Sequence, residues 1–209
     1  VLCDAAAKLA SAVSSGIPGQ DVFLEHVHLN FSGNYLLARE WAEQVHNQLA
    51  ARLPSGAGTD WPSQERCDRL LGLTDWNRAS VFEEVVRRIH EPPFTGQFDN
   101  DQRMAALSNQ ISECQTRIAS IPPAAAAGIY ETALATAPED YHLHENFAEF
   151  LEAKHDERAT AERRKVCDLI PFFYFPYYRL GLDFEEQGRL DEAVQAFKQA
   201  AALRPAQSE

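Results

Sequence analysis

The chain has 209 residues, of which 45% are hydrophobic and 24% charged, and its 31 acidic and 19 basic side chains give a net charge of −12. This length and composition predict one or two globular domains with a buried core. The acidic balance excludes sequence-independent binding of nucleic acid, because such binding needs basic groups that displace counterions from phosphates. The sequence contains no apolar run of about 18 residues, so we expect no membrane contact by this segment.

The first motif in chain order is a short apolar run followed by a loop that carries acid and imidazole groups. The apolar run covers 22–24 and is strand-like, and the loop covers 25–34. A helix is predicted over 35–53, with a buried stripe of apolar side chains every four residues: Leu37, Trp41, Val45 and Leu49. An α/β hydrolytic enzyme places its last catalytic loop between such a strand and helix.

Two other interpretations of this loop stay open. His26 and His28 could bind a metal together with Glu25 or Asp21, but the spacing of known zinc motifs is absent, so we expect no metal and no other cofactor. Alternatively, His28 and Asn30 only hydrogen-bond the loop, and Asn30 or Ser32 caps the following helix.

The middle of the chain predicts two shorter helices and a proline-rich strap. Loop residues over 54–62 indicate a boundary, and helices follow over 65–71 and from 75 or 80 to 90. The second helix has an apolar face of Val81, Val85, Val86 and Ile89. The prolines of 91–98 exclude a helix there, and Phe94 and Phe98 predict a segment buried across a helical surface. A role of this segment as a peptide ligand is the alternative.

The C-terminal part carries an internal repeat. The last unit has eight residues in the order and spacing of the tetratricopeptide (TPR) pattern: Tyr177, Leu180, Gly181, Phe184, Ala193, Phe197, Ala200 and Pro205. Gly181 is small where two antiparallel helices cross, and Gly188 can take the positive φ that the turn between them requires.

The same pattern applies one repeat upstream, where Pro171 closes the unit and Leu143, Phe150, Ala159 and Val166 match. Phe147 and Arg163 depart from it, so we expect looser packing there. A weaker third unit ends at Pro138, with helices over 104–118 and 124–137. The chain thus contains about two and a half repeat units, which is close to the minimum of three for a stable stack.

First helices of stacked hairpins form a concave face. Its predicted lining is Tyr141, His144, Ala148, Leu151, Phe175, Tyr178, Leu182 and Glu185. Such an aromatic surface suits an extended peptide or a partner helix, and the alternative is that a neighbouring helix of the same chain covers it. If the repeats only cap and stabilise a hydrolase domain, the chain's own Phe94 or Phe98 should fill the groove. The last hairpin lacks a polar capping helix, which indicates a further repeat or self-association through this edge.

The four cysteines, at positions 3, 67, 114 and 167, are scattered along the chain without metal-ligand spacing. Free cysteines usually behave as small hydrophobic residues, so we expect buried, unreactive thiols. The redox state of the compartment is not indicated by these positions.

The loop also carries a family resemblance. Glu25-x-x-His28-x-Asn30, followed by Gly33, Tyr35 and the helix start Leu36-Leu37-Ala38, resembles the last conserved block of the SGNH/GDSL hydrolase-like family. Most of the chain resembles the C-terminal part of bacterial GDSL-like proteins with TPR repeats. The further similarities are 16–19, 73–76, 92–97 and the repeats themselves.

The resemblance implies that His28 is the general base for a serine nucleophile and that Glu25 is the acid that orients it, where the family usually has Asp. The family's Gly-Asp-Ser nucleophile turn and its oxyanion-hole blocks lie upstream and are not in this chain. The chain opens on Val1 without a signal-peptide pattern, so we expect a piece or a processed product of a longer protein. The resemblance further implies a parent anchored in a bacterial membrane, with these domains outside the cytoplasm.

The sequence thus predicts a mainly α fold: a remnant of a hydrolase-like domain over 1–53, a helical bridge over 54–105, and TPR-like hairpins over 106–209. The leading function is a TPR-type protein-interaction or scaffolding region with a protein or peptide partner and no catalysis of its own. The alternative is one part of an SGNH-type ester hydrolase whose serine lies upstream.

Overall fold

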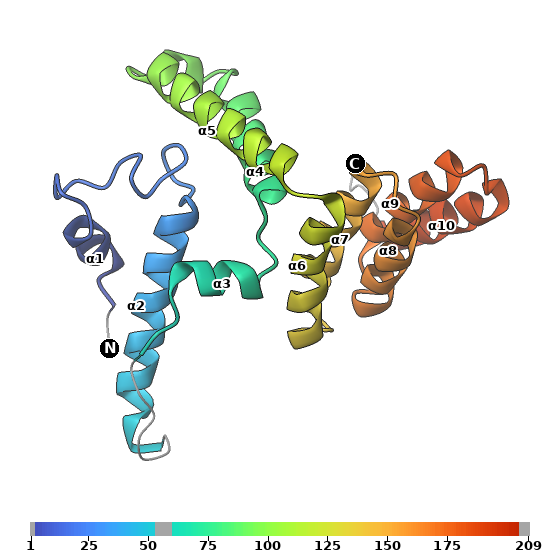
Figure 1. Ribbon diagram of the computed structural model, residues 1–209, viewed down its shortest axis with the longest axis horizontal. Helices are drawn as coiled ribbons and strands as arrows, with labels where there is room; N and C mark the ends of the chain where they lie inside the picture. The colour runs from blue at the N-terminus through green and yellow to red at the C-terminus, as the bar shows by residue number, and fades with distance from the viewer. Residues whose placement is uncertain (1–2, 53–59, 205–209) are drawn as a thin grey trace. The chain divides into compact units, whose positions relative to one another are not determined.

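The computed structural model describes residues 3–52 and 60–204 (Figure 1). These residues form ten α-helices and two short 3-10 helices, and they contain no β-strand. The helices are α1 (Ala5–Ser11), α2 (Phe31–Leu49), α3 (Gln64–Leu70), α4 (Asp75–Ile89), α5 (Asn100–Ser120), α6 (Pro123–Thr136), α7 (Tyr141–Ala153), α8 (Arg158–Leu169), α9 (Tyr174–Glu186) and α10 (Leu190–Leu203). The mainly α prediction is therefore confirmed. Pro205 and most of the predicted boundary loop lie outside the described residues.

The chain divides into two compact units. The first comprises Val1–Cys67 and Arg78–Cys114, and the second comprises Asp68–Asn77 and Gln115–Glu209. Helix α5 begins in the first unit and ends in the second. The limit proposed between 105 and 106 lies within this one helix.

In the first unit, α2 begins where Asn30 caps it. The Asn30 side chain accepts a hydrogen bond from the Gly33 N–H at 2.8 Å, which satisfies one of the donors that a helix start leaves open. The run at 22–24 makes a single antiparallel bridge, between Phe23 and Leu29, and no strand. An isolated extended segment without neighbouring strands cannot form a sheet.

The predicted buried stripe of α2 is wrong for Trp41 and Val45, which are each 56% exposed, and for Leu49, which is 38% exposed. Helix α1 packs against another side of α2, where Lys8 pairs with Glu40 at 3.2 Å. Leu37 lies at that junction and is half-buried. The four-residue spacing does place Leu37, Trp41 and Val45 on one side of the helix. Among the described residues, however, no element buries Trp41 or Val45.

Helix α4 carries the other apolar contacts of the first unit. Its buried side chains are Ala79, Phe82, Val85 and Ile89, while Val81 is exposed, contrary to prediction. Phe31 of α2 meets Phe82 edge to face, with ring centroids 5.6 Å apart. Phe82 thus replaces Val81 in the apolar face, because Phe82, Val85 and Ile89 follow the three-and-four spacing of a helix side.

The proline-rich strap behaves differently at its two aromatic residues. Phe94 is half-buried, and its ring lies 5.1 Å from the ring of His26. Phe98 is fully exposed, so its predicted burial is wrong. A 3-10 turn over Phe94–Gly96 precedes Phe98, whose ring none of the described residues covers.

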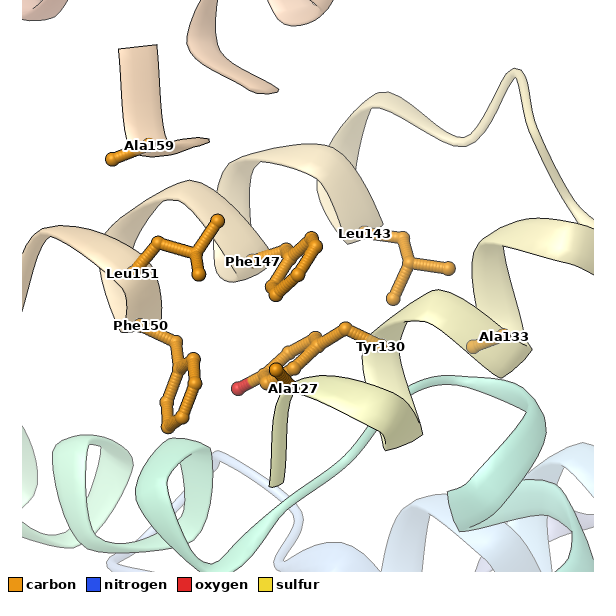
Figure 2. Packing of buried hydrophobic residues seen from close by; sticks show 8 residues of the cluster. All are labelled: Ala127, Tyr130, Ala133, Leu143, Phe147, Phe150, Leu151 and Ala159. Atoms are coloured by element: carbon orange, nitrogen blue, oxygen red, sulfur yellow. The ribbon is translucent and has the colours of Figure 1, made fainter. Parts of the chain in front are cut away.

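In the second unit, α6 to α10 pack in succession, each helix on the next. A buried cluster joins α6, α7 and α8 (Figure 2): Ala127, Tyr130, Ala133, Leu143, Phe147, Phe150, Leu151 and Ala159. Tyr130 is its centre and is completely buried. Its hydroxyl donates to Asn77 Oδ1 at 2.7 Å and lies 3.0 Å from Thr74 Oγ1, so the polar end of the ring is satisfied.

The hairpin of α9 and α10 has the geometry that the TPR pattern predicts. A Cβ at Gly181 would stand 2.5 Å from a ring carbon of Phe197, so the two helices cross too closely for any larger residue. Gly188 has φ +70° in the turn, as expected. With α7 and α8 as the preceding hairpin, this unit has a TPR-like fold.

In the hairpin of α7 and α8, the two residues that depart from the TPR pattern, Phe147 and Arg163, have partners on other helices. The ring of Phe147 stacks on Tyr130 of α6, with centroids 5.0 Å apart. The guanidinium of Arg163 donates to Asp183 of α9 at 2.7 Å. Both residues are buried, so each is integrated into the packing between neighbouring helices.

Candidate functional site

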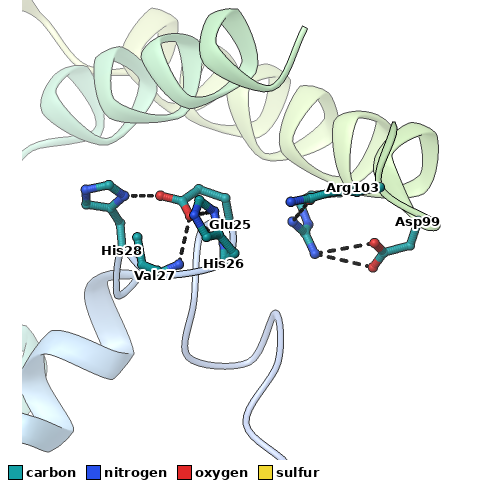
Figure 3. Close-up of polar contacts among 7 residues, drawn as sticks. Glu25, His26, Val27, His28, Asp99 and Arg103 are labelled. Carbon is teal, nitrogen blue, oxygen red and sulfur yellow. Dashed lines mark hydrogen bonds and ion pairs between the residues drawn. The ribbon is translucent and has the colours of Figure 1, made fainter. Parts of the chain in front are cut away.

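Glu25 and His28 are in direct contact in the loop ahead of α2 (Figure 3). The Nδ1 atom of His28 meets Glu25 Oε1, and the Val27 N–H donates to Glu25 Oε2 at 2.8 Å. The N–H of His26 donates to the same oxygen, and His26 Nδ1 lies 2.7 Å from it. The structure therefore brings together the two residues that the resemblance paired.

The backbone holds this loop in a closed shape. The Leu24 N–H donates to the carbonyl of His28 at 2.8 Å, and the Asn30 N–H donates to the carbonyl of Val22 at 2.9 Å. The Asn30 side chain also donates to the carbonyl of Gln20 at 3.1 Å. Asn30 thus links the loop to the start of α2, and the four residues from Glu25 to His28 form its tip.

The Glu25 carboxylate is buried, whereas the side chain of His28 is 58% exposed. Burial pushes the pKa of the Glu25 carboxyl upward, but the bonds from His28 and from the backbone N–H groups of Val27 and His26 together hold this pKa below its ordinary value. The carboxylate is therefore ionised at neutral pH and acts as an acceptor for His28. With Nδ1 occupied by Glu25, Nε2 is the ring nitrogen that can take a proton from another group.

Residues 94–103 of the same unit add an aromatic contact to the loop and a separate ion pair. Phe94 lies against His26, and Arg103 of α5 pairs with Asp99 at 3.4 Å (Figure 3). Arg103 also donates to Gln97 at 3.0 Å, which fixes the segment after Phe94. In the described part of the chain, no group of three or more His, Cys, Asp or Glu side chains is arranged to hold a metal ion.

The predicted concave lining divides into buried and open residues. Leu151 belongs to the buried cluster of Figure 2. His144 is also buried, with Nδ1 2.6 Å from Glu162 Oε2 and Nε2 3.0 Å from the carbonyl of Pro138. These two side chains, like Ala148, serve the packing of the hairpins and are not available to a partner.

The open part of the lining lies mainly on α9. Phe175 is 38% and Tyr178 45% exposed, and their ring centroids are 6.4 Å apart. Glu185 is exposed, and Leu182 and Tyr141 are half-buried. Phe172 and Phe173 at the start of α9 are exposed as well, so aromatic surface gathers around this helix.

Sequence reasoning missed a partly buried charge cluster that joins α7, α8 and α9. Arg163 pairs with Asp183 at 2.7 Å and with Glu152 at 2.5 Å, and Arg179 pairs with Glu152 at 3.0 Å. Burial raises the pKa of the Asp183 carboxyl, against the opposing effect of the Arg163 charge. The signal was present, because Arg163 occupies a position where the repeat pattern normally has an aromatic residue.

Comparison with known proteins gives a limited result. No family model matches the sequence, and no curated protein is similar to it. Among the solved structures that are similar to this chain is one titled "Crystal structure of MamA", which is 17% identical, covers 62% of this chain and 80% of its own, and has a TM-score of 0.38. None of the described helices is both long and apolar enough to span a membrane.

Proposed function

We propose that the second unit is a TPR-type protein-interaction region that holds a partner segment along α9. The observation that carries this proposal is the exposure of Phe175 and Tyr178 next to each other on one helix. Exposed apolar surface that is grouped in this way is typical of binding sites, and stacked helical hairpins receive extended peptides or helices along such faces.

The position of α9 supports this function. Gly181 lets α10 approach closely, and the Arg163–Asp183 pair ties α9 to α8. The aromatic rings are thus carried by a helix that is fixed on two sides. A surface that is ordered before binding loses less conformational entropy when a partner arrives.

The test is selection of a displayed peptide library on the full chain, followed by titration of the selected peptides in solution. We expect the double variant Phe175→Ala with Tyr178→Ala to bind them at least about tenfold more weakly, since hot-spot aromatic residues each contribute roughly 1–2 kcal/mol or more. Phe98→Ala is the matched control, because it removes an exposed aromatic ring from the other unit. Selected peptides that bind the double variant as tightly as the original chain would refute the proposal.

The Glu25–His28 contact is the observation that favours a second candidate function. We propose that this pair belongs to an SGNH-type ester hydrolase whose serine lies upstream of this chain, in a parent that is anchored in a bacterial membrane. His28 would take the proton of the serine hydroxyl through Nε2 as the oxygen attacks the ester carbonyl. The proton would then pass to the leaving alcohol, while Glu25 orients the imidazole and stabilises its cation.

The test compares hydrolysis of an activated acetyl ester by this chain and by a version extended upstream. We expect activity only in the extended protein, with a loss of about a thousandfold or more in its His28→Ala variant. Glu25→Gln should lower the rate but keep the fold, and His26→Ala should change the rate much less. An extended protein that is inactive, or that is unaffected by His28→Ala, would exclude this second function.

A further inference from the structure

The outer side of α10 carries an apolar stripe that the described residues leave open. Leu190 is 63% and Val194 47% exposed, Ala201 is exposed, and Phe197 is half-buried. The intervals of four, three and four residues place all four on one side of the helix. The neighbouring side of α10 is packed, because Ala193, Ala196 and Ala200 are buried there.

The repeat shows what such a side normally contacts. One repeat earlier, the residues equivalent to Val194, Phe197 and Ala201 are Thr160, Arg163 and Cys167 of α8, and all three are buried. Helix α9 covers them. Gln187 donates to Thr160 at 2.7 Å, Asp183 accepts from Arg163 at 2.7 Å, and Cys167 packs with Leu180 and Phe184.

The first helices of the two hairpins show the same contrast. His144 and Ala148 of α7 are buried, whereas their equivalents on α9, Tyr178 and Leu182, are exposed and half-buried. Tyr178 lies 5.8 Å from Phe197 between ring centroids, so the open surfaces of α9 and α10 are continuous. The α10 stripe is therefore a hairpin-stacking face whose helical partner is not among the described residues.

We propose that a second copy of this chain covers the α10 stripe, with the two α10 helices antiparallel across a two-fold axis near Gln195. In this arrangement Leu190 of one copy faces Ala201 of the other, so that a large side chain meets a small one. A parallel arrangement would instead place Leu190 against Leu190 and leave a gap at Ala201.

Charges beside the stripe favour the same arrangement. Asp191 and Lys198 are both exposed, and the helix period places both on one flank of the stripe. Antiparallel pairing brings Asp191 of each copy opposite Lys198 of the other, at two symmetric positions. Parallel pairing about a two-fold axis would instead place this flank of the two copies on opposite sides of the interface, so Asp191 and Lys198 would lose these partners.

The experiment measures the oligomeric state of the full chain by sedimentation velocity over a range of concentrations. We expect a monomer–dimer equilibrium. Val194→Glu should abolish the dimer, because it would bury two uncompensated carboxylates. Phe98→Ala is the control and should leave the dimer unchanged.

A charge exchange then tests the antiparallel pairing itself. Asp191→Lys alone and Lys198→Asp alone should each raise the dimer dissociation constant several-fold, and the variant with both changes should recover the original value. These changes leave Phe175 and Tyr178 in place, so peptide binding can be measured on the same variants and is expected to persist. A chain that stays monomeric at all concentrations, a dimer unaffected by Val194→Glu, or a double exchange no better than the single ones would each overturn the proposal.

Discussion

Arg163 of α8 donates from Nε to Oδ2 of Asp183 on α9 at 2.7 Å, and both side chains are buried. This pair stands where a more regular repeat would have an aromatic contact. It makes the junction between the two hairpins depend on charge compensation, because Asp183 without Arg163 would lose its ion-pair partner, whereas Arg163 also pairs with Glu152 at 2.5 Å.

Arg163→Leu should therefore lower the free energy of unfolding by about 3–5 kcal/mol, because it leaves the buried Asp183 carboxylate without this partner. The double variant Arg163→Leu with Asp183→Leu removes both charges and should be more stable than Arg163→Leu alone. Urea unfolding followed by circular dichroism measures both. Equal stability of the single and double variants would mean that the pair is not a mutual compensation.

Because the Tyr130 hydroxyl is buried, we predict that the chain loses stability at high pH. Burial raises the pKa of Tyr130 to about 12, although its bonds with Thr74 and Asn77 act in the opposite direction. The folded chain then keeps a proton that the unfolded chain releases above the ordinary pKa of 10.0, so stability is lost as the pH rises from about 10 toward 12.

Tyr130→Phe should remove this part of the alkaline pH dependence and cost about 1 kcal/mol at neutral pH, through the lost hydrogen bonds. Urea unfolding at pH 8 and pH 11 tests it. An unchanged alkaline loss in the variant would contradict the assignment to Tyr130.

For the Glu25 carboxylate we predict a loss of stability at low pH, opposite to the alkaline loss expected for Tyr130. Its folded pKa lies below the ordinary value of 4.5, so its contribution to stability is fully present above that value and is lost as the pH falls through the folded pKa. We expect Glu25→Gln to be less stable than the original chain at pH 7, and the difference to shrink below about pH 4. A difference that is constant between pH 7 and pH 3 would show that the carboxylate charge is not what the loop needs.

The thiols should differ in reactivity. Burial is the main cause that raises the pKa of Cys167 to about 12, whereas Cys3 and Cys67 are half-buried. Only a thiolate attacks a disulfide reagent, so we expect Cys167 to stay unlabelled in the folded chain at pH 8. The folded chain and its Cys167→Ser variant should therefore take up the same number of labels. In denaturant the variant should take up one label fewer. Weaker labelling of the folded variant would mean that Cys167 opens to solvent.

Local spacing predicted the parts of the fold that depend on neighbours within one hairpin. Gly181, Gly188 and Phe197 were placed correctly because a helical crossing and its turn constrain residues at fixed intervals. The cap at Asn30 was predictable for the same reason. In each case the partner lies close in the sequence.

The failures concern partners that lie far away in the sequence. A four-residue period shows that Trp41 and Val45 share a side of α2, but it does not show whether another element covers that side. Arg163 and Phe147 were recognised as departures from the pattern, but their partners Asp183 and Tyr130 could not be found by spacing. The contact of Glu25 with His28 was expected from the resemblance to the SGNH/GDSL hydrolase-like family, and not from any periodic spacing of residues.

The central claim is that a partner segment binds along the aromatic surface of α9, and isotope-labelled chain titrated with a selected peptide tests it most directly. We predict that the backbone amide signals of Phe175, Tyr178 and Leu182 shift together and saturate at one dissociation constant, while signals of Phe82 and Val85 in the first unit stay in place. Saturating shifts confined to the first unit, with α9 unaffected, would contradict the claim.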